Sequence, residues 1–493
     1  ASARRIEEPI RTDDDLGSLW DAITYEKGQT VLAMFEAWLG PERFQAGVRR
    51  YIQRHAWGTA TGDDFFRALA EQDPALPAAV RSFTRQAGIP LLDVTLRCDD
   101  GPPRLDLRQS RLLPLGSPAG PGDPRWQLPL MVRTPAGTSR LLMTGPDARL
   151  PLPDAQCPAW VQANASGAGY YRTAYSGLGL QGLVNAPGLS IGDWLVLLDD
   201  LQGLHEAGLS GNAQALALVG AGAAHPSAEV QQRAAELLAW LQPLVADVHR
   251  QAHAATWRAA FGARARALGW VAQPGEPQDL KLLRSTLLPL VATLGQDEPL
   301  REQSQGLALA WLADRNAVAA GLRGPVLNTA AQTSADAAAP ALFDALLAAL
   351  RNSSQRPERR DLLSALGHFR QPALAQRARE LLLAPWLDIR DSLDALMRAQ
   401  ARDPGTRAGA LDFMTRQQAA VVQRMGREAV AGLPRFFKSA CSADEARRIE
   451  AAFAPQAARY PGGQASLQRT LESVQLCSAW RAWQANGQPI GGT

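Results

Sequence analysis

Two histidines are the first residues whose spacing could support catalysis. His249 and His253 lie four residues apart, which would place both imidazoles on one helix face, as in a zinc peptidase. Such an enzyme also needs a glutamate after the first histidine to deprotonate the metal-bound water, and Arg250 stands there instead. No acidic third ligand follows at a suitable spacing, and no C-x-x-C pair exists. We therefore expect no metal site in this chain and interpret the pair as ordinary helix histidines.

Two neighbouring glycine patterns could carry other chemistry. Gly177–Gly182 has the spacing of a dinucleotide fingerprint, and Gly188–Gly192, with Ser190 at its centre, has that of a nucleophile elbow. Both patterns need a strand-turn-helix unit within a parallel α/β sheet, and no alternation of strands with helices surrounds them. We therefore expect a glycine-rich linker here, followed by a helix for which Ser190 is the N-cap.

The four cysteines fall into two pairs that lie far apart, Cys98 with Cys157 and Cys441 with Cys477. An even, paired distribution indicates two disulfides and an oxidising compartment. The periplasm or the exterior of the cell is then favoured over the cytoplasm. Four reduced thiols in a protein core are the alternative that the sequence alone leaves open.

Composition excludes several classes of protein. The 493 residues suggest about three domains, and a 46% hydrophobic content excludes wholesale disorder. The 51 basic residues against 48 acidic ones give a net charge of only +3, which does not indicate a nucleic-acid-binding protein. No run of 18 apolar residues occurs, so we expect no membrane span.

The chain has three successive regions with different hydrophobic patterns, which together predict an α+β multidomain protein. Residues 1–88 have helical periodicity. The residues at 89–175 form short alternating runs between Gly/Pro clusters, which indicate a small β-sandwich. Residues 176–493 form short helical stretches broken by Pro, Gly and Asn, which indicate a large C-terminal α-solenoid.

Within the first region, local signals place three helices. The spacing of Val31, Met34, Phe35 and Trp38 predicts one buried stripe, and Gly40 followed by Pro41 ends that helix and starts the next. The second helix is expected to present Phe44, Val48, Tyr51 and Ile52 on one face. The third helix is expected to begin near Thr61-Gly-Asp-Asp, whose short polar side chains can cap free amides.

The segment around Tyr25 resembles the aminopeptidase N family of zinc exopeptidases. It reads Tyr-Glu-Lys-Gly at 25–28, and similarity continues through Gly47–Tyr51, Thr59–Phe65 and Phe83–Pro90. The segments Trp160–Asn164 and Gly169–Tyr175 are similar to the last strands of that family's sandwich, and two stretches, 360–367 and 387–391, are similar to its helical C-terminal domain.

The resemblance implies a function and site residues. The family cleaves N-terminal residues from peptides with a zinc-bound water, and Tyr25 matches the tyrosine whose hydroxyl donates to the developing oxyanion. Gly28 follows about one turn later, where a missing side chain would leave room beside Tyr25. In the helical domain, Arg424, Arg427 and Arg435 are candidates for binding a peptide's C-terminal carboxylate, with ordinary surface arginines as the alternative.

The chain also departs from the family's pattern. It contains no H-E-x-x-H motif, and only 24 residues precede Tyr25, where the family has its zinc ligands and its amine-binding segment. We therefore expect the helical tail of a thermolysin-like catalytic domain, the sandwich and the solenoid of a larger zinc enzyme. Its partners would be peptides and the missing catalytic half, in the same chain or a separate one. By itself the chain is expected to bind no zinc and to be inactive; a non-catalytic binding scaffold is the alternative.

Overall fold

The chain folds into two units, Ala1–Leu218 and Val219–Thr493, in a computed structural model that describes residues 4–9, 23–71, 73–118, 124–176 and 180–487. The first unit contains all strands of the described chain, and the described residues of the second unit are helical with short connections. The prediction of a largely helical protein with a small β region is therefore confirmed.

Five helical elements precede the strands in the described part of the first unit, and local chemistry sets several of their ends. They are the π-helix η1 (Ile23–Lys27) and the α-helices α2 (Gly28–Leu39), α3 (Pro41–Arg54), α4 (Gly62–Ala70) and α5 (Leu76–Thr84). Gly40 has a φ of 87°, which ends α2, and Pro41 occupies the first turn of α3. The Thr61 hydroxyl accepts from the Asp64 amide while the Asp64 carboxylate accepts from the Thr61 amide, so the predicted cap is confirmed as a capping box.

The apolar faces of α2 and α3 differ in how far they are buried. Val31, Met34 and Phe35 are buried as expected. On α3, Ile52 is 60% exposed, so this end of its apolar face lies at the surface. Helix α3 approaches α4 closely at Gly47, where an added Cβ would lie 2.5 Å from a Leu69 methyl group.

Two sheets follow the helices. The four-stranded sheet has the order β5-β2-β1-β6, and the two-stranded sheet pairs β3 with β4. Their bounds are β1 (Pro90–Arg97), β2 (Arg104–Arg111), β3 (Leu128–Thr134), β4 (Gly137–Met143), β5 (Asp147–Pro151) and β6 (Arg172–Ser176). Strand β1 runs parallel to β6, and the other pairs are antiparallel.

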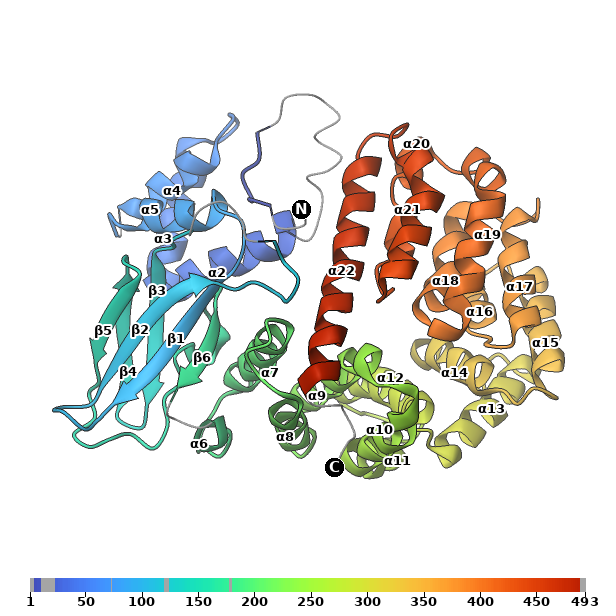
Figure 1. Ribbon diagram of the computed structural model, residues 1–493, viewed down its shortest axis with the longest axis horizontal. Helices are drawn as coiled ribbons and strands as arrows, with labels where there is room; N and C mark the ends of the chain where they lie inside the picture. The colour runs from blue at the N-terminus through green and yellow to red at the C-terminus, as the bar shows by residue number, and fades with distance from the viewer. Residues whose placement is uncertain (1–3, 10–22, 72, 119–123, 177–179, 488–493) are drawn as a thin grey trace. The chain divides into compact units, whose positions relative to one another are not determined.

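The helices and the sheets of the first unit share one hydrophobic core, to which both Phe35 of α2 and Leu92 of β1 belong. The rings of Phe35 and Phe83 meet edge to face with centroids 6.0 Å apart. Figure 1 shows α2 to α5 gathered beside one end of the strands. The expected domain boundaries at residues 88 and 175 stay predictions.

Three helices complete the described part of this unit after the strands: α6 (Leu180–Val184), α7 (Ile191–Glu206) and α8 (Asn212–Ala223), the last of which runs across residue 218. The Ser190 hydroxyl accepts from the Asp193 amide at the start of α7, in a second capping box. The interpretation of Ser190 as a helix cap is therefore confirmed. The fingerprint-like Gly177–Gly182 begins outside the described residues.

The second unit is a series of helices in which alternate members pack together: α12 against α14, α14 against α16, and α16 against α18 (Figure 1). The α-helices are α9 (Ala228–Trp240), α10 (Arg250–Trp257), α11 (Ala263–Leu268), α12 (Gln278–Thr293), α13 (Glu298–Ala313), α14 (Ala320–Thr333), α15 (Ala339–Asn352), α16 (Arg356–Gly367), α17 (Pro372–Glu380), α18 (Ile389–Arg402), α19 (Pro404–Gln423), α20 (Arg427–Val430), α21 (Ala443–Ala457) and α22 (Gly463–Gly487). Shorter turns join them: η3 (Gln242–Leu244), η4 (Asp247–His249), η5 (Arg258–Gly262), η6 (Leu381–Leu383) and η7 (Leu433–Phe437).

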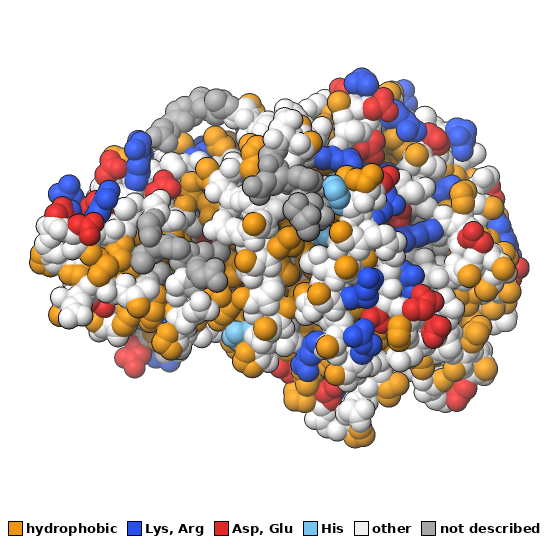
Figure 2. All heavy atoms as spheres, turned by 60° about the horizontal axis from the view of Figure 1, so that its bottom comes forward, with side chains coloured by type: hydrophobic (Ala, Val, Ile, Leu, Met, Phe, Trp, Pro, Cys, Tyr) orange, Lys and Arg blue, Asp and Glu red, His pale blue; other side chains and the backbone are white. Residues whose placement is uncertain are grey.

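Each unit contains one disulfide. Cys98 is joined to Cys157 in the first unit, with Cα atoms 5.6 Å apart, and Cys441 to Cys477 in the second, with Cα atoms 5.0 Å apart. On the face drawn in Figure 2, basic and acidic side chains are interspersed, as the small net charge leads one to expect. Among the described helices, none combines the length and the apolar character needed to cross a bilayer.

Candidate functional site

Tyr25 lies on η1, the single turn of π-helix that precedes α2. A π-turn adds one residue to a helical turn, and such turns recur at functional sites because they redirect a side chain. The side chain of Tyr25 is 54% exposed, although its neighbours Ile23 and Thr24 are partly buried. Tyr25 is therefore partly exposed at the surface of the described chain.

Lys27, two residues later, points in the opposite direction and is buried. Its ammonium donates to the carbonyl oxygens of Gln86 at 3.0 Å and Gly88 at 3.4 Å, and it lies 5.6 Å from the centre of the Tyr170 ring. Burial, reinforced by the nearby guanidinium of Arg111, lowers the pKa of Lys27 to about 8. One end of the turn that carries Tyr25 is thus tied to the segment that leads into β1.

Gly28 does not have the internal packing role that a mid-helix glycine suggested. A Cβ built at this position meets no atom of the described chain within 4 Å. Nothing within the described residues therefore requires a glycine at this position.

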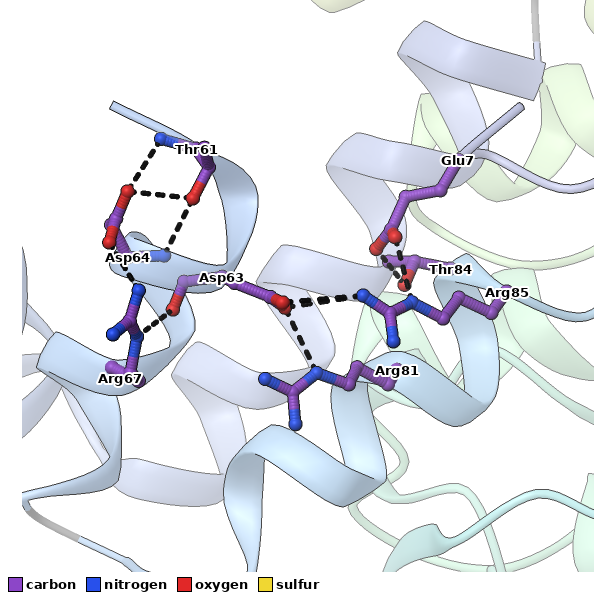
Figure 3. Close-up of polar contacts among 8 residues, drawn as sticks. All are labelled: Glu7, Thr61, Asp63, Asp64, Arg67, Arg81, Thr84 and Arg85. Carbon is purple, nitrogen blue, oxygen red and sulfur yellow. Dashed lines mark hydrogen bonds and ion pairs between the residues drawn. The ribbon is translucent and has the colours of Figure 1, made fainter. Parts of the chain in front are cut away.

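A polar network lies just before residues 86–88, whose carbonyl groups bind Lys27. Figure 3 shows this network. Asp63 of α4 accepts from Arg81 at 2.9 Å and pairs with Arg85, and Arg85 in turn donates to Glu7 at 2.9 Å. The hydrogen bond from Arg81 lowers the pKa of Asp63, so the carboxylate stays ionised. The backbone amide of Glu7 also donates to the Thr84 carbonyl. The network thus joins the N-terminal segment at Glu7 to α4 and to the end of α5.

The three arginines suggested for carboxylate binding have different surroundings. The guanidinium of Arg424 donates to the backbone carbonyls of Leu382, Ala384 and Leu387, so it is already used to join two segments of the helical unit. The side chain of Arg427 lies outside the described residues, although its backbone begins α20. Arg435 donates to the Ser466 hydroxyl at 3.3 Å and lines a cavity.

That cavity lies within the second unit and has a volume of about 510 Å³, within the range usual for ligand pockets. It is formed by α18 together with the segment from Met425 to Lys438, and its apolar lining includes Leu393, Met425 and Phe436. Its charged lining is mostly basic: Arg390, Arg398, Arg402, Arg435, Lys438 and Asp394.

The histidine pair does not form a metal site in the described chain. His253 is buried, and its Nε2 accepts from the Trp257 indole at 3.1 Å. Burial lowers the pKa of His253 to about 4, so it is a neutral acceptor inside the helical unit. Among the described residues, no three His, Cys, Asp or Glu side chains converge as metal ligands would.

Sequence reasoning missed Lys27 and most of the basic cavity. Lys27 belongs to the Tyr-Glu-Lys-Gly motif, but its anchoring role gave no signal, because its carbonyl partners come 59 and 61 residues later. The cavity residues of α18 did carry one: charged residues recur at every fourth position from Arg390 to Arg402, which puts them along one face of a helix.

Comparison with known proteins matches two separate parts of the chain to two family models. Residues 160–476 match the ERAP1-like C-terminal domain, and residues 1–86 match the peptidase family M1 domain. Aminopeptidase M1 of Arabidopsis thaliana is 26% identical over 79% of this chain and 46% of its own length. Aminopeptidase 2 of Candida albicans is 26% identical over 77% of this chain and 41% of its own length. The chain spans about half the length, or less, of the curated relatives it matches.

Proposed function

The chain belongs to the M1, or aminopeptidase N, family and carries its ERAP1-like C-terminal domain, and from this premise we propose that it is the C-terminal part of a zinc aminopeptidase. The complete protein releases N-terminal residues from peptides by metal-assisted hydrolysis. This chain supplies an oxyanion-stabilising tyrosine and part of the chamber that receives the peptide, with the family's sandwich and α-solenoid as its frame.

The observation that carries the proposal is the presentation of Tyr25. Its side chain is exposed at the surface of η1, while Lys27 anchors the same turn from inside. A neutral phenol has a proton to donate and a rigid ring that can be aimed. Tyr25 therefore donates to the oxygen of the substrate carbonyl as negative charge develops on it, which stabilises the transition state more than the ground state.

Zinc chemistry belongs to residues outside the described chain. The M1 family is zinc-dependent, and the metal, when bound, polarises the carbonyl and activates water. The described residues do not fit such a site, because no three ligating side chains converge among them and the Nε2 of His253 already bonds to Trp257. The catalytic half that holds zinc is proposed as a partner, either in the same polypeptide or in a separate one.

The substrate's other end is assigned to the basic cavity. Arg435 lines it and is positioned to meet the C-terminal carboxylate of a peptide. Arg424 is left out of this role, since three backbone carbonyls already occupy its guanidinium. The two disulfides support placing the protein in an oxidising compartment, the periplasm or outside the cell.

The decisive experiment is Tyr25→Phe in the complete protein. We expect kcat to fall about 10²- to 10³-fold with little change in KM, as when one oxyanion donor is removed elsewhere. Tyr51→Phe is the matched control, because it removes the same hydroxyl from another tyrosine of the first unit. The Tyr51 ring on α3 packs edge to face on Phe65 of α4. A Tyr25→Phe enzyme with near-normal kcat rules the assigned role out.

A non-catalytic binding scaffold is the second candidate, and the cavity is the observation that favours it. Both functions predict peptide binding by this chain. Only the enzyme predicts that upstream coding sequence contains H-E-x-x-H in frame, and that Tyr25→Phe impairs turnover without impairing binding.

A further inference from the structure

We propose that the basic cavity selects peptides whose C-terminal residue is itself acidic, so that the ligand presents two carboxylates rather than one. This inference rests on the proposed function, which assigns the α-carboxylate of the peptide to Arg435, and it adds the chemical class of the last side chain.

Two cations of the cavity already have an acidic partner. Arg390 is paired with Asp388 at 2.6 Å, and Arg398 with Asp394 at 2.6 Å. Both pairs are made within α18 or at its N-terminus, by carboxylates one turn away or less. These two cations therefore bring little net charge to a ligand.

Two other cations of the lining form no ion pair among the described residues. Arg402 closes the C-terminal end of α18, and Lys438 follows η7, which packs on the same helix. Burial and the neighbouring guanidinium of Arg398 lower the pKa of Arg402, and the weaker attraction of Asp394, which already pairs with Arg398, opposes this only in part. The positive charge of Arg402 is therefore held in an unfavourable place.

A ligand anion removes that cost. One carboxylate placed by Arg435 leaves Arg402 and Lys438 without an ion pair among the described residues, whereas a second carboxylate in the cavity can pair with both. The apolar lining, including Leu393, Met425 and Phe436, suits the methylene groups between the two carboxylates of a C-terminal Asp or Glu.

The test measures binding to the 493-residue chain by calorimetry, with peptides that differ only at the C-terminus. One ends in Glu with a free carboxylate, one in Gln with a free carboxylate, and one in Gln as the amide. At an ionic strength of about 0.15 M, we expect the Glu peptide to bind at least about tenfold more tightly than the Gln peptide, the least a charge-assisted hydrogen bond contributes.

Variants connect this preference to the cavity. Arg402→Gln and Lys438→Gln should each weaken binding of the Glu peptide and leave binding of the Gln peptide almost unchanged. Arg402→Lys should retain part of the preference for the Glu peptide. Arg447→Gln is the control, since Arg447 is an exposed arginine paired with Asp444 outside the cavity. Circular dichroism and thermal unfolding verify that each variant is folded.

The outcomes distinguish the acidic preference from the function on which it rests. Equal binding of the Glu and Gln peptides, with the amide weaker, overturns the inference and leaves the carboxylate anchor standing. Failure of all three peptides to bind overturns both. Displacement of the Glu peptide by inorganic phosphate at matched ionic strength shows a general anion site and overturns the assignment to acidic peptides.

Discussion

Tyr25 and Lys27 lie two positions apart on one turn of π-helix, and their side chains meet opposite environments. The phenol is exposed, while the ammonium is buried against two backbone carbonyls and the face of Tyr170. A buried lysine without a carboxylate among the described residues is costly, and its lowered pKa expresses that cost. The two hydrogen bonds from its ammonium fix the C-terminal end of η1, so Lys27 is a positioning residue for Tyr25 rather than a catalytic one.

Replacement of Lys27 by Met should therefore impair turnover more than binding. The Met side chain fills a similar volume but cannot donate to Gln86 and Gly88, so η1 loses its inner attachment. In the complete protein we expect kcat to fall about tenfold or more with KM nearly unchanged, because small displacements of a reacting group are expensive. Amide hydrogen exchange should speed up in residues 23–27.

Lys281→Met supplies the control for that variant, because Lys281 is exposed on α12 and the substitution is the same. A Lys27→Met protein that exchanges and turns over like the control would show that η1 is held by other contacts. A loss that falls on KM alone would also count against positioning.

Where α7 packs against β6, the buried carboxyl group of Asp200 has a raised pKa. Asp200 of α7 is buried, accepts from the Thr173 hydroxyl of β6, and lies 3.9 Å from the Arg172 guanidinium. Its Oδ1 has no hydrogen-bond partner in the described chain. Burial raises the pKa of Asp200 to about 7, and the neighbouring Asp199 adds to the shift.

The sign of the pH dependence follows from that shift. The pKa is higher in the folded chain than in the unfolded one, so the contribution of Asp200 to stability is complete below about pH 4 and is lost as pH rises through 7. Asp200→Asn keeps a hydrogen-bonding group of similar shape and removes the charge. The variant should gain stability relative to the native chain as pH rises from about 4 to about 7, by at most about 4 kcal/mol for a shift of this size, and the gain should stay constant at higher pH.

Urea unfolding of the first unit, followed by hydrogen exchange at several pH values, measures this difference. Asp199→Asn is the neighbouring control, since Asp199 is partly exposed. A difference between Asp200→Asn and the native chain that stays constant with pH would mean that Asp200 is ionised throughout.

Elements whose ends are fixed by local hydrogen bonds were predictable from sequence. The caps at Thr61 and Ser190 need only a hydroxyl and a carboxylate three residues later, and Gly40-Pro41 marks a helix junction by backbone geometry alone. Strand β5 was not predicted, because it is five residues long and ends in proline, and its pairing with β2 is not encoded nearby.

Contacts between distant segments were the part that could not be predicted. Arg424 looked like a free surface cation, but its carbonyl acceptors lie 37 to 42 residues earlier in the chain. The close approach of α3 to α4 joins Gly47 to Leu69, and neither residue alone signals that contact. For the candidate site, a family resemblance identified Tyr25 and Arg435, whereas the contacts of Lys27 and the other cations of the cavity required the fold.

At the scale of the whole chain, each of the two units closes its own disulfide loop. Cys98–Cys157 spans 59 residues of the first unit, and Cys441–Cys477 spans 36 residues of the second. A crosslink stabilises mainly by restricting the unfolded chain, and loops of these lengths correspond to about 4 kcal/mol each in the entropic account. Neither crosslink joins the two units, so each should act on the unit that contains it.

Paired Cys→Ser substitutions test this division. Removing Cys98 and Cys157 should accelerate hydrogen exchange through unfolding in residues 1–218 and leave the second unit nearly unchanged, and removing Cys441 and Cys477 should do the reverse. Thiol titration of the denatured native chain should detect no free thiol before reduction and four after it. Four free thiols before reduction would show that neither disulfide is formed, and the protein would then give no support to an oxidising compartment. Equal destabilisation of both units by either pair would instead mean that the chain unfolds as one cooperative body, in which a crosslink in one unit stabilises the other.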